Sequence, residues 1–488
     1  MELAIHLNAN AAQPLHKQLY HELRSSILNG RLSAGQRIPS TRALAKSLGL
    51  SRATVTQSYE QLTSEGYLQT VVGSGTSVSK QLPDELLQAA PVKASRQATP
   101  KPNGKIKLSG YGVRLANFAR EPEEPNLLFN FKYCRPAVDH FPLQEWRRLL
   151  LRHCRAGEHE MLDYADGGKG YKPLREALAR YLGRARAVYC GAEQIIIVNG
   201  SQQALQLSAQ VLVDRGDLVA LEEPGYLGAR HAFLTHGARL HPVAVDEAGI
   251  RLEALPAAQA RLLYVTPSHQ FPTGAVLSLS RRLELLAWAE KTGTLILEDD
   301  YDSEFRYCGR PIPSLQGLAP RENVLYVGTF SKVLFPSLRI GYLVVPQALA
   351  DTFERAKWLM DRHTPTLEQR ALADFINEGH LERHLRRMRT LYDCRRQKLA
   401  GALQTHFGER VAILGENSGM HLMIRLRTPW SNEEVIRRAT AAGVGMINAR
   451  IYYLGQARAG EFVMGYAPLS ERKIQEGVRR LANALALT

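Results

Sequence analysis

The sequence predicts a multidomain protein in which a small helical domain with a β-hairpin precedes a large α/β domain. The chain has 488 residues, and single hydrophobic cores rarely grow beyond roughly 250–300 residues. Residues 1–80 combine helical apolar spacing with a hairpin pattern. From residue 126 onward, short β-branched runs alternate with amphipathic helices. This alternation is typical of a mostly parallel sheet with helices on both faces.

Composition excludes several classes of protein. Hydrophobic residues make up 45% and charged residues 22% of the chain, which excludes a mainly disordered protein. No segment approaches the roughly 18 apolar residues of a membrane span, and the N-terminus lacks a signal-peptide pattern. The five cysteines show neither CxxC nor zinc spacing. We therefore expect a cytoplasmic protein without a membrane partner, a metal site or a disulfide framework.

The first 80 residues follow the order of a winged helix-turn-helix. An apolar stripe at helical spacing predicts a first helix over residues 15–27. Ser40 is a good N-cap for a second helix over 41–48, and Ser51 can cap a third helix. Residues 66–78 then predict a two-stranded hairpin with a glycine-rich turn.

The third predicted helix has the composition of a DNA recognition helix. Val55 and Tyr59 are expected to face the core, whereas its polar side chains, Ser58 among them, are expected to face outward. A helical cap or dimerisation module with solvated polar faces is the alternative interpretation. The candidate DNA contacts are Ser40, Arg42, Ser51, Arg52, Thr54, Gln57 and Gly75.

The formal net charge of +15 fits either a polyanionic partner or a solvated arginine-rich surface. Residues 1–80 contribute only +4 of this charge, so the motifs and not the charge predict DNA binding. The segments that closely resemble the winged helix of the GntR family are Pro14–Tyr20, Gly30–Leu32, Gly35–Arg42, Leu48–Val55 and Glu65–Leu68. The resemblance implies that Arg42, Arg52 and the wing near Gly75 contact double-stranded operator DNA, with the protein acting as a dimer.

Residues 81–125 are predicted to form a mobile linker, because prolines interrupt them and apolar periodicity is lost. The predicted organisation is therefore a DNA-binding domain over 1–80, a linker over 81–125, and a second domain over 126–488. A linker of this length allows the DNA-binding domain to dock on a partner subunit in a domain-swapped homodimer.

The second domain carries the groups that a pyridoxal cofactor requires, namely a lysine amine for a Schiff base, a carboxylate for the pyridine nitrogen, a phosphate cradle and an aromatic face. Lys332 follows the apolar strand 324–327. The hydroxyls of Thr329 and Ser331, together with Arg339, suit a phosphate beside the amine. A surface lysine at a strand end is the alternative interpretation.

Asp299 follows the apolar run 294–297, at the strand end where open α/β sheets bind ligands. Its carboxylate can keep the pyridine nitrogen protonated, and Tyr301 can hydrogen-bond the phenolic oxygen of the ring. A solvated turn is the alternative interpretation of the acidic run 298–300.

Two further segments complete the predicted site. Ser201 and Gln202 open a helix after the strand 195–198, and the free N–H groups of a helix start favour phosphate. Tyr226, after the strand 218–221, can stack on the ring. A plain capped helix and a packed core tyrosine are the alternatives.

In order and spacing these residues resemble fold type I aminotransferases, including the 33-residue separation of Asp299 and Lys332. The resemblance covers residues 126–488 and implies bound pyridoxal 5'-phosphate, with Tyr164 reaching the phosphate of a partner subunit. Together with the GntR-like start, the whole chain resembles the MocR/GabR family of transcriptional regulators, with the vitamin B6-sensing subclass as the nearest match.

Several positions depart from the aminotransferase pattern. Phe271 stands where an asparagine is expected, and Val463 stands where an arginine commonly clamps the substrate α-carboxylate. A nearer arginine after Tyr226 is also missing, unless Arg230 or Arg450 substitutes. We therefore expect weak or absent transamination, with pyridoxal phosphate itself as the small-molecule effector. A sensor of an amino acid or amine that forms an external aldimine, and a catalytically active aminotransferase, are the alternatives.

Overall fold

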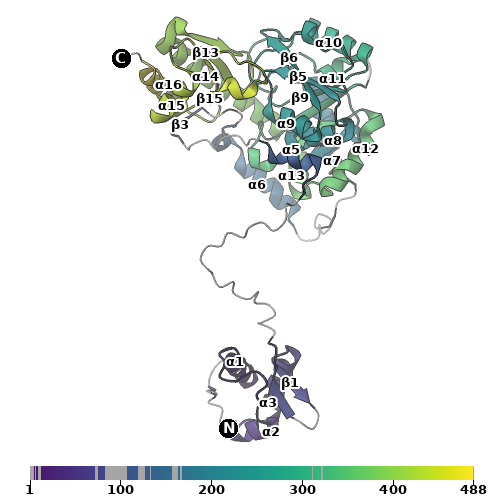
Figure 1. Cartoon of the computed structure of the whole chain (residues 1–488), viewed down its shortest axis with the longest axis vertical. Helices are drawn as coiled ribbons and strands as arrows, with labels where there is room; N and C mark the ends of the chain where they lie inside the picture. Colours follow the sequence, from purple (N-terminus) through teal and green to yellow (C-terminus); the bar gives the residue numbers. More distant parts are fainter. Residues whose placement is uncertain are drawn as a thin grey trace. The chain divides into compact units, whose positions relative to one another are not determined.

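The computed structural model describes residues 5, 7–8, 13–71, 75–82, 107–118, 127–131, 133, 135–155, 163–164, 167–309, 312–319 and 322–486. Contacts divide the chain into two compact units, Met1–Ile106 and Lys107–Thr488, which Figure 1 draws. The second unit therefore begins inside the segment predicted as a linker. Residues 83–106 and 119–126 of that segment lie outside the described residues.

The first unit has the predicted order of helices and strands. Its elements are α1 (Leu15–Leu28), α2 (Thr41–Leu48), α3 (Arg52–Ser64), β1 (Leu68–Val71) and β2 (Gly75–Val78). The two strands pair antiparallel. Ser40 and Ser51 are the N-caps of α2 and α3, because their side-chain oxygens accept hydrogen bonds from the backbone N–H groups of Ala43 at 3.2 Å and Thr54 at 3.1 Å.

The core of the first unit joins α1 to α3. Leu19, Val55 and Leu62 are fully buried there. Ser58 is also fully buried, and its Oγ donates to the backbone oxygen of His16 at 2.8 Å. The prediction that Ser58 faces outward is wrong, because its hydroxyl ties α3 to α1 and is not available to DNA.

The second unit is built on an eight-stranded sheet with the order β4-β11-β10-β9-β8-β5-β6-β7. Its strands are β4 (Ile195–Val198), β5 (Leu218–Glu223), β6 (Arg239–Asp246), β7 (Gly249–Ile250), β8 (Leu262–Val265), β9 (Leu295–Asp300), β10 (Val324–Thr329) and β11 (Gly341–Val344). The pairs from β10 through β6 are parallel, whereas β11 runs antiparallel to both of its neighbours. The predicted mostly parallel sheet is therefore confirmed.

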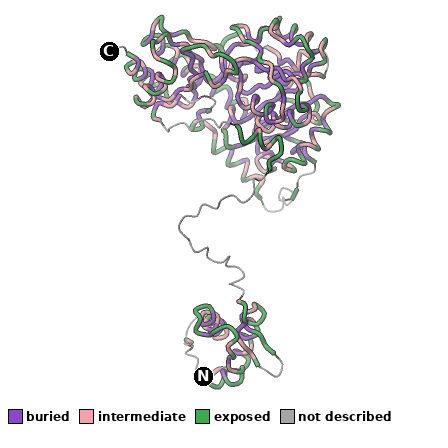
Figure 2. Tube along the Cα trace, in the orientation of Figure 1, coloured by how far each residue is buried: buried purple, intermediate pink, exposed green. Residues whose placement is uncertain are grey.

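Helices cover both faces of this sheet, which explains why β4, β8, β10 and β11 are buried along their whole length (Figure 2). The helices around the sheet are α7 (Lys172–Arg186), α8 (Ser201–Leu212), α9 (Leu227–His236), α10 (Leu279–Thr292), α11 (Leu315–Leu318), α12 (Ala350–Asp361) and α13 (Thr366–Asn377). One core cluster packs α8, α9 and α12 on the sheet, and another packs α10 and α11. Strands that are buried on both faces read as continuous apolar runs in the sequence.

A smaller helical and antiparallel region completes the second unit. Its elements are α14 (His380–Phe407), β12 (Val411–Leu414), β13 (His421–Leu426), α15 (Asn432–Ala441), β14 (Val444–Gly445), β15 (Ile447–Asn448), β16 (Glu461–Gly465) and α16 (Glu471–Ala484). The strand order β12-β13-β16-β15 is antiparallel throughout. A short parallel pair joins β14 to β3 (Phe129–Asn130). In the described part of the chain, no helix is long and apolar enough to cross a membrane.

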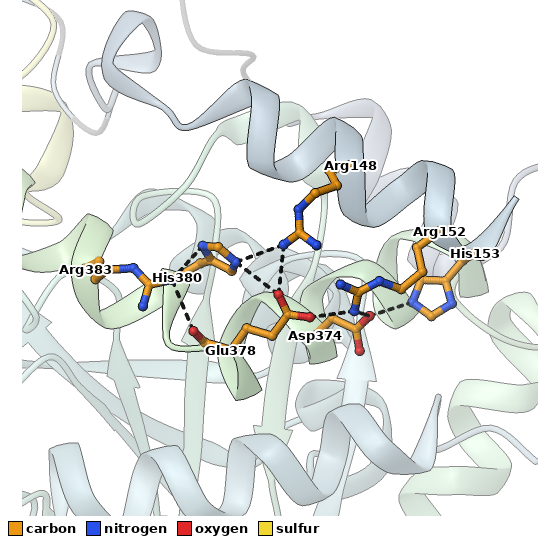
Figure 3. Close-up of polar contacts among 7 residues, drawn as sticks. All are labelled: Arg148, Arg152, His153, Asp374, Glu378, His380 and Arg383. Atoms are coloured by element: carbon orange, nitrogen blue, oxygen red, sulfur yellow. Dashed lines mark hydrogen bonds and ion pairs between the residues drawn. The ribbon is translucent and has the colours of Figure 1, made fainter.

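Charged side chains tie α6 (Leu143–His153) to α13 and to the start of α14 (Figure 3). Arg152 lies 2.8 Å from Asp374 and 2.5 Å from Glu378, and Arg148 lies 2.9 Å from Glu378. These two guanidinium groups lower the pKa of Glu378 to about 2. The arginines of this face of α6 are thus neutralised by acids of α13 and of the turn that follows it.

A short helix, α5 (Gly110–Ala116), lies within the predicted linker but packs on α9. The Nε of Arg114 donates to the backbone oxygen of Thr235 at 2.8 Å, and the ring of Phe118 lies 4.0 Å from that of His231. Periodicity did not reveal this helix, because its contacts come from a segment more than a hundred residues away.

Arg282 is fully buried and lies near the carboxylate of Glu298, on β9. Its guanidinium donates to the backbone oxygens of Leu277 at 3.1 Å, Pro313 at 3.1 Å and Pro267 at 2.8 Å. It also lies 3.8 Å from the fully buried Glu298. Burial raises the pKa of Glu298 to about 6, although the charge of Arg282 opposes this shift.

We predict that Arg282→Met lowers the free energy of unfolding by about 3–5 kcal/mol, because a buried carboxylate loses its counter-charge. The pKa of Glu298 lies above its value in the unfolded chain, so the stability of the variant should fall as pH rises through about 6 and beyond. Urea denaturation on both sides of this pH measures the effect. Arg251→Met removes an exposed pair with Glu253 and should leave the stability almost unchanged, because solvent screens such a pair. A loss that does not vary with pH would contradict the role given to Glu298.

Candidate functional site

The acidic run at the end of β9 is buried, and its three carboxylates have different partners. Glu298 accepts hydrogen bonds from the backbone N–H groups of Leu315 and Gln316, both at 3.0 Å. Asp300 accepts from Arg186 at 2.7 Å and from the Tyr326 hydroxyl at 2.5 Å. The alternative of a solvated turn is therefore wrong.

Asp299 lies between these two acids and is 4% exposed, and only one of its two carboxylate oxygens accepts a hydrogen bond. Its Oδ2 accepts from the Tyr264 hydroxyl at 2.9 Å, whereas its Oδ1 is buried and has no hydrogen-bond partner in the described structure. Burial raises the pKa of Asp299 to about 7, and the Tyr264 hydrogen bond and the charge of Lys332 partly oppose this. A buried, unpaired carboxylate oxygen is the acceptor that a protonated pyridine nitrogen requires.

Lys332 lies half-buried in the loop that follows β10. Its charge lowers the pKa values of both Asp299 and His421, which places the amine among these buried groups and not on an isolated surface. Thr329 Oγ1 accepts from the backbone N–H of Ser331 at 3.2 Å. The Oγ of Ser331 is buried without a partner in the described structure. A free hydroxyl beside the lysine suits a phosphate oxygen.

A basic side chain, Arg339, lies close to the backbone at the start of α8. Gly200 is the N-cap, with φ 88°, and Ser201 begins the helix as predicted. A Cβ added at Gly200 would lie 2.7 Å from Nη2 of Arg339, which donates to the backbone oxygen of Asn199 at 2.8 Å. Because Gly200 has no side chain, the guanidinium of Arg339 can lie against the helix start, where an anion is favoured.

Two predicted aromatic residues lie at the carboxyl ends of β9 and β5, the two strands that flank β8 in the sheet. Tyr301 follows β9, and its hydroxyl donates to the backbone oxygen of His269 at 3.0 Å. Tyr226 follows β5 and is half-buried, with its ring 5.8 Å from that of Phe271. Gln202 uses its Nε2 to donate to the backbone oxygen of Gly228 at 3.2 Å, which ties the start of α8 to α9.

The structure adds residues that the sequence did not single out. His269 Nδ1 lies 3.0 Å from each carboxylate oxygen of Asp302, and its ring lies 4.8 Å from that of His421. The ligand atoms of these three buried residues lie within 4.8 Å of one another, so they could hold a metal ion, although the sequence spacing predicted none. His269 and Asp302 follow β8 and β9 at one edge of the sheet, and that shared position is the signal that could have found them.

Tyr164 lies apart from this cluster on the surface. Its side chain is 81% exposed, and its ring lies edge-on to that of His363 at 6.0 Å. Its reach into the site of a partner subunit stays a prediction.

The positions considered for the carboxylate clamp hold a valine, a buried arginine and an exposed arginine. Val463 is fully buried in β16. Arg230 is buried, and its Nη2 donates to the backbone oxygen of Tyr452 at 2.6 Å. Arg450 is exposed and donates to the backbone oxygen of Tyr453 at 3.3 Å. Arg230 therefore anchors the 449–452 turn to α9 and does not replace the missing clamp.

On the first unit, most of the predicted DNA contacts are exposed. Arg42, Arg52 and Gln57 are exposed, and Thr54 is half-buried. Ser40 and Gly75, which come from the start of α2 and from the wing, line one groove. The hydroxyl oxygens of Ser40 and Ser51 accept backbone hydrogen bonds as N-caps, so only their remaining hydrogen-bonding capacity is available to phosphate.

Comparisons with known proteins match each unit to a known family. Residues 132–481 match the family described as aminotransferase class I and II, and residues 15–78 match the gntR family of bacterial regulatory proteins. The chain is 40% identical over 480 residues to the probable rhizopine catabolism regulatory protein MocR of Rhizobium meliloti, which covers 98% of this chain and 95% of MocR. It is 30% identical over 486 residues to the HTH-type pyridoxine biosynthesis transcriptional regulator PdxR of Corynebacterium glutamicum, which covers 100% of this chain and 99% of PdxR.

Among solved structures, the chain resembles LysN, the α-aminoadipate aminotransferase of Thermus thermophilus, complexed with N-(5'-phosphopyridoxyl)-L-leucine. The TM-score is 0.69 at 32% identity, and the match covers 78% of this chain and 95% of LysN. The fold and these matches define a DNA-binding transcriptional regulator that depends on pyridoxal phosphate. In it a GntR-type winged helix is joined to a fold type I aminotransferase domain. The chain belongs to the MocR/GabR family of such regulators.

We predict opposite effects of Asp299→Asn on stability and on cofactor binding. The pKa of Asp299 is raised from 3.8 to about 7, so without cofactor its contribution to stability falls as pH rises through about 7. The neutral amide removes this cost, and above pH 7 the cofactor-free variant should be more stable than the unmodified protein by about 1–4 kcal/mol. It should also retain pyridoxal phosphate poorly, because an amide cannot pair with the charged ring.

Thermal unfolding of the cofactor-free proteins at acid and alkaline pH, together with equilibrium dialysis of pyridoxal phosphate, measures both effects. Asp351→Asn, at an 81% exposed side chain, serves as the matched control and should change neither property. Unchanged cofactor retention in Asp299→Asn would contradict the assignment of Asp299 to the ring nitrogen.

Proposed function

We propose that pyridoxal phosphate is itself the signal of this regulator, and that occupancy of Lys332 reports its abundance and so regulates genes of vitamin B6 supply. The unpaired Oδ1 of Asp299 and the unpaired Oγ of Ser331 support binding at the ring and phosphate ends of the cofactor. When bound, the cofactor supplies an electrophilic aldehyde and an electron-withdrawing ring. The residues of this chain hold it through the amine, one carboxylate and the phosphate cradle.

The hydrogen bonds of Arg230 to backbone oxygens support the proposal that the signal is the cofactor and not an amino acid. Its guanidinium, the nearest candidate for a carboxylate clamp, is held by backbone oxygens, and the clamp position itself is Val463. Without a bidentate clamp an amino acid is poorly oriented, and orientation accounts for much of the rate of a reaction such as transamination. This arrangement favours a binding role over steady turnover.

We further propose that the regulator acts as a homodimer in which the DNA-binding unit of one chain docks on the second unit of the other. The exposed Tyr164 supports a site completed by two subunits, because its ring is available to a neighbouring chain. Ordering of the cofactor site must then favour one arrangement of the DNA-binding units over another, since a ligand shifts an equilibrium only by its differential affinity.

Lys332→Ala tests the proposal. In the unmodified full-length protein, pyridoxal phosphate should change operator affinity by roughly 5–100-fold, the usual range of coupling between two sites. In Lys332→Ala the change should disappear together with the visible absorbance of the bound cofactor. Lys291→Ala, at an exposed position on α10, is the matched control and should respond like the unmodified protein.

The same titration separates the alternatives. An amino acid or amine that changes operator affinity where pyridoxal phosphate alone does not would replace the proposal with an amine sensor. Sustained turnover with an amino donor and a keto acid, abolished in Lys332→Ala, would identify a working aminotransferase.

A further inference from the structure

Most of the basic excess of this chain lies outside the DNA-binding domain. Residues 1–80 carry +4 of the net charge of +15, which leaves +11 for the rest of the chain. Helix α14 contains seven Lys and Arg residues against two acids. The cofactor site does not account for this segment, because none of its arginines contributes to the groups described there.

A groove runs along the outward face of α14. It is lined by Arg383, Arg386, Arg387, Thr390, Leu391 and Cys394, together with His140 and Glu471. The α14 residues recur every three or four positions, so they share one face of the helix. A second groove continues from Cys394 and Glu471 to Lys398 and His406. From Arg383 to Lys398 the basic face extends over about 22 Å.

The arginines of this groove differ from those nearby in lacking acidic partners. Figure 3 shows Arg148 and Arg152 of α6 bound to acids, and Arg383 beside the His380 ring at 2.9 Å. The side chains of Arg386 and Arg387 are exposed and make no ion pair or hydrogen bond within the described part of the chain. Their charges are therefore uncompensated by the protein.

The two acids near the groove do not neutralise the charges of Arg386 and Arg387. Glu471 lies 3.9 Å from Nε of Arg395, a buried arginine whose Nη1 donates to the backbone oxygen of Ala467. Asp139 is 70% exposed and lies 3.7 Å from His140. Neither carboxylate makes an ion pair with Arg386 or Arg387, so the floor of the groove stays strongly positive.

The geometry points to a long polyanion and not to a single small anion. The cations lie in mid-helix, where the backbone N–H groups are already bonded, so no cluster of amides converges on one phosphate. A basic face about 22 Å long matches a backbone that presents many phosphates in a row. Unpaired arginines bind such a backbone by releasing its counterions, whereas arginines in ion pairs have less to gain.

DNA is already the partner of this chain through its first unit. The segment between Leu82 and Lys107 can span at most about 85 Å, which allows both surfaces to act on one duplex. We propose that the α14 groove binds the phosphate backbone of DNA that flanks the operator, with Arg386 and Arg387 as its main contacts. This proposal requires the DNA-binding function only and is independent of which effector the cofactor site senses.

The test compares the full-length protein with Arg386→Ala/Arg387→Ala on two duplexes selected by the protein itself, one trimmed to the operator and one extended on both sides. On the extended duplex, the slope of log affinity against log salt should weaken by about 1.8 for each groove engaged. Affinity at about 0.1 M salt should fall roughly 10-fold or more. On the trimmed duplex the variant should bind like the unmodified protein.

Arg437→Ala/Arg479→Ala is the matched control, since it removes the same charge from exposed helix positions. Arg437 pairs with Glu434 at 2.6 Å and Arg479 with Glu476 at 2.8 Å, so neither is an unpaired cation. An equal loss in the control would show an effect of net charge alone and would overturn the proposal. Unchanged affinity of Arg386→Ala/Arg387→Ala on the extended duplex would also overturn it, provided that thermal unfolding and cofactor absorbance show an intact protein.

Discussion

The burial of three consecutive carboxylates at the end of β9 is the constraint on which the cofactor site depends. Charges in the interior of a protein are tolerated only when they are paired or hydrogen-bonded. Arg282 and the start of α11 satisfy Glu298, and Arg186 with Tyr326 satisfies Asp300. Asp299 alone keeps an unpaired oxygen. The partners of Glu298 and Asp300 come from other segments and fix the end of β9, whereas the unpaired oxygen of Asp299, whose pKa is raised, is left available to a cationic ring.

The same sheet edge shows how an aminotransferase fold can serve regulation. The lysine, the acid and the phosphate cradle remain, but the side chain that could orient a substrate carboxylate holds the backbone of the 449–452 turn instead. Arg230 also connects this turn to α9, the helix on which α5 packs. The cofactor site and the point where the described second unit begins are therefore joined through one short helix. A regulator needs contacts of this kind, because coupling between two sites is carried by contiguous packed and hydrogen-bonded groups.

Arginine in this protein has two distinct uses, which composition cannot separate. Arg186 and Arg282 are buried and satisfy carboxylates, and Arg148 and Arg152 bridge helices through acidic partners. Each of these arginines is offset by its acidic partner in the net charge and contributes little to the field outside the protein. Exposed arginines without partners, as on α14, are the ones that act on a distant polyanion. The value of +15 gives the excess of cations over acids, but it does not say where on the surface this excess lies.

The sequence by itself determined the fold class, the division into two domains and the candidate residues of each site. Local signals were sufficient for these, since apolar runs placed strands such as β4, a capping serine placed the start of α2, and motif spacing selected Lys332 and Asp299 as candidates. The tertiary structure alone decided the environment of each polar group. It buried the acidic run, turned Ser58 toward α1, engaged Arg230, and brought His269 to Asp302. The physical reason is that a side chain's partners come from distant segments, as with Arg186 and Asp300, which are 114 residues apart. Periodicity records which face of an element is buried, but it does not record which groups meet there.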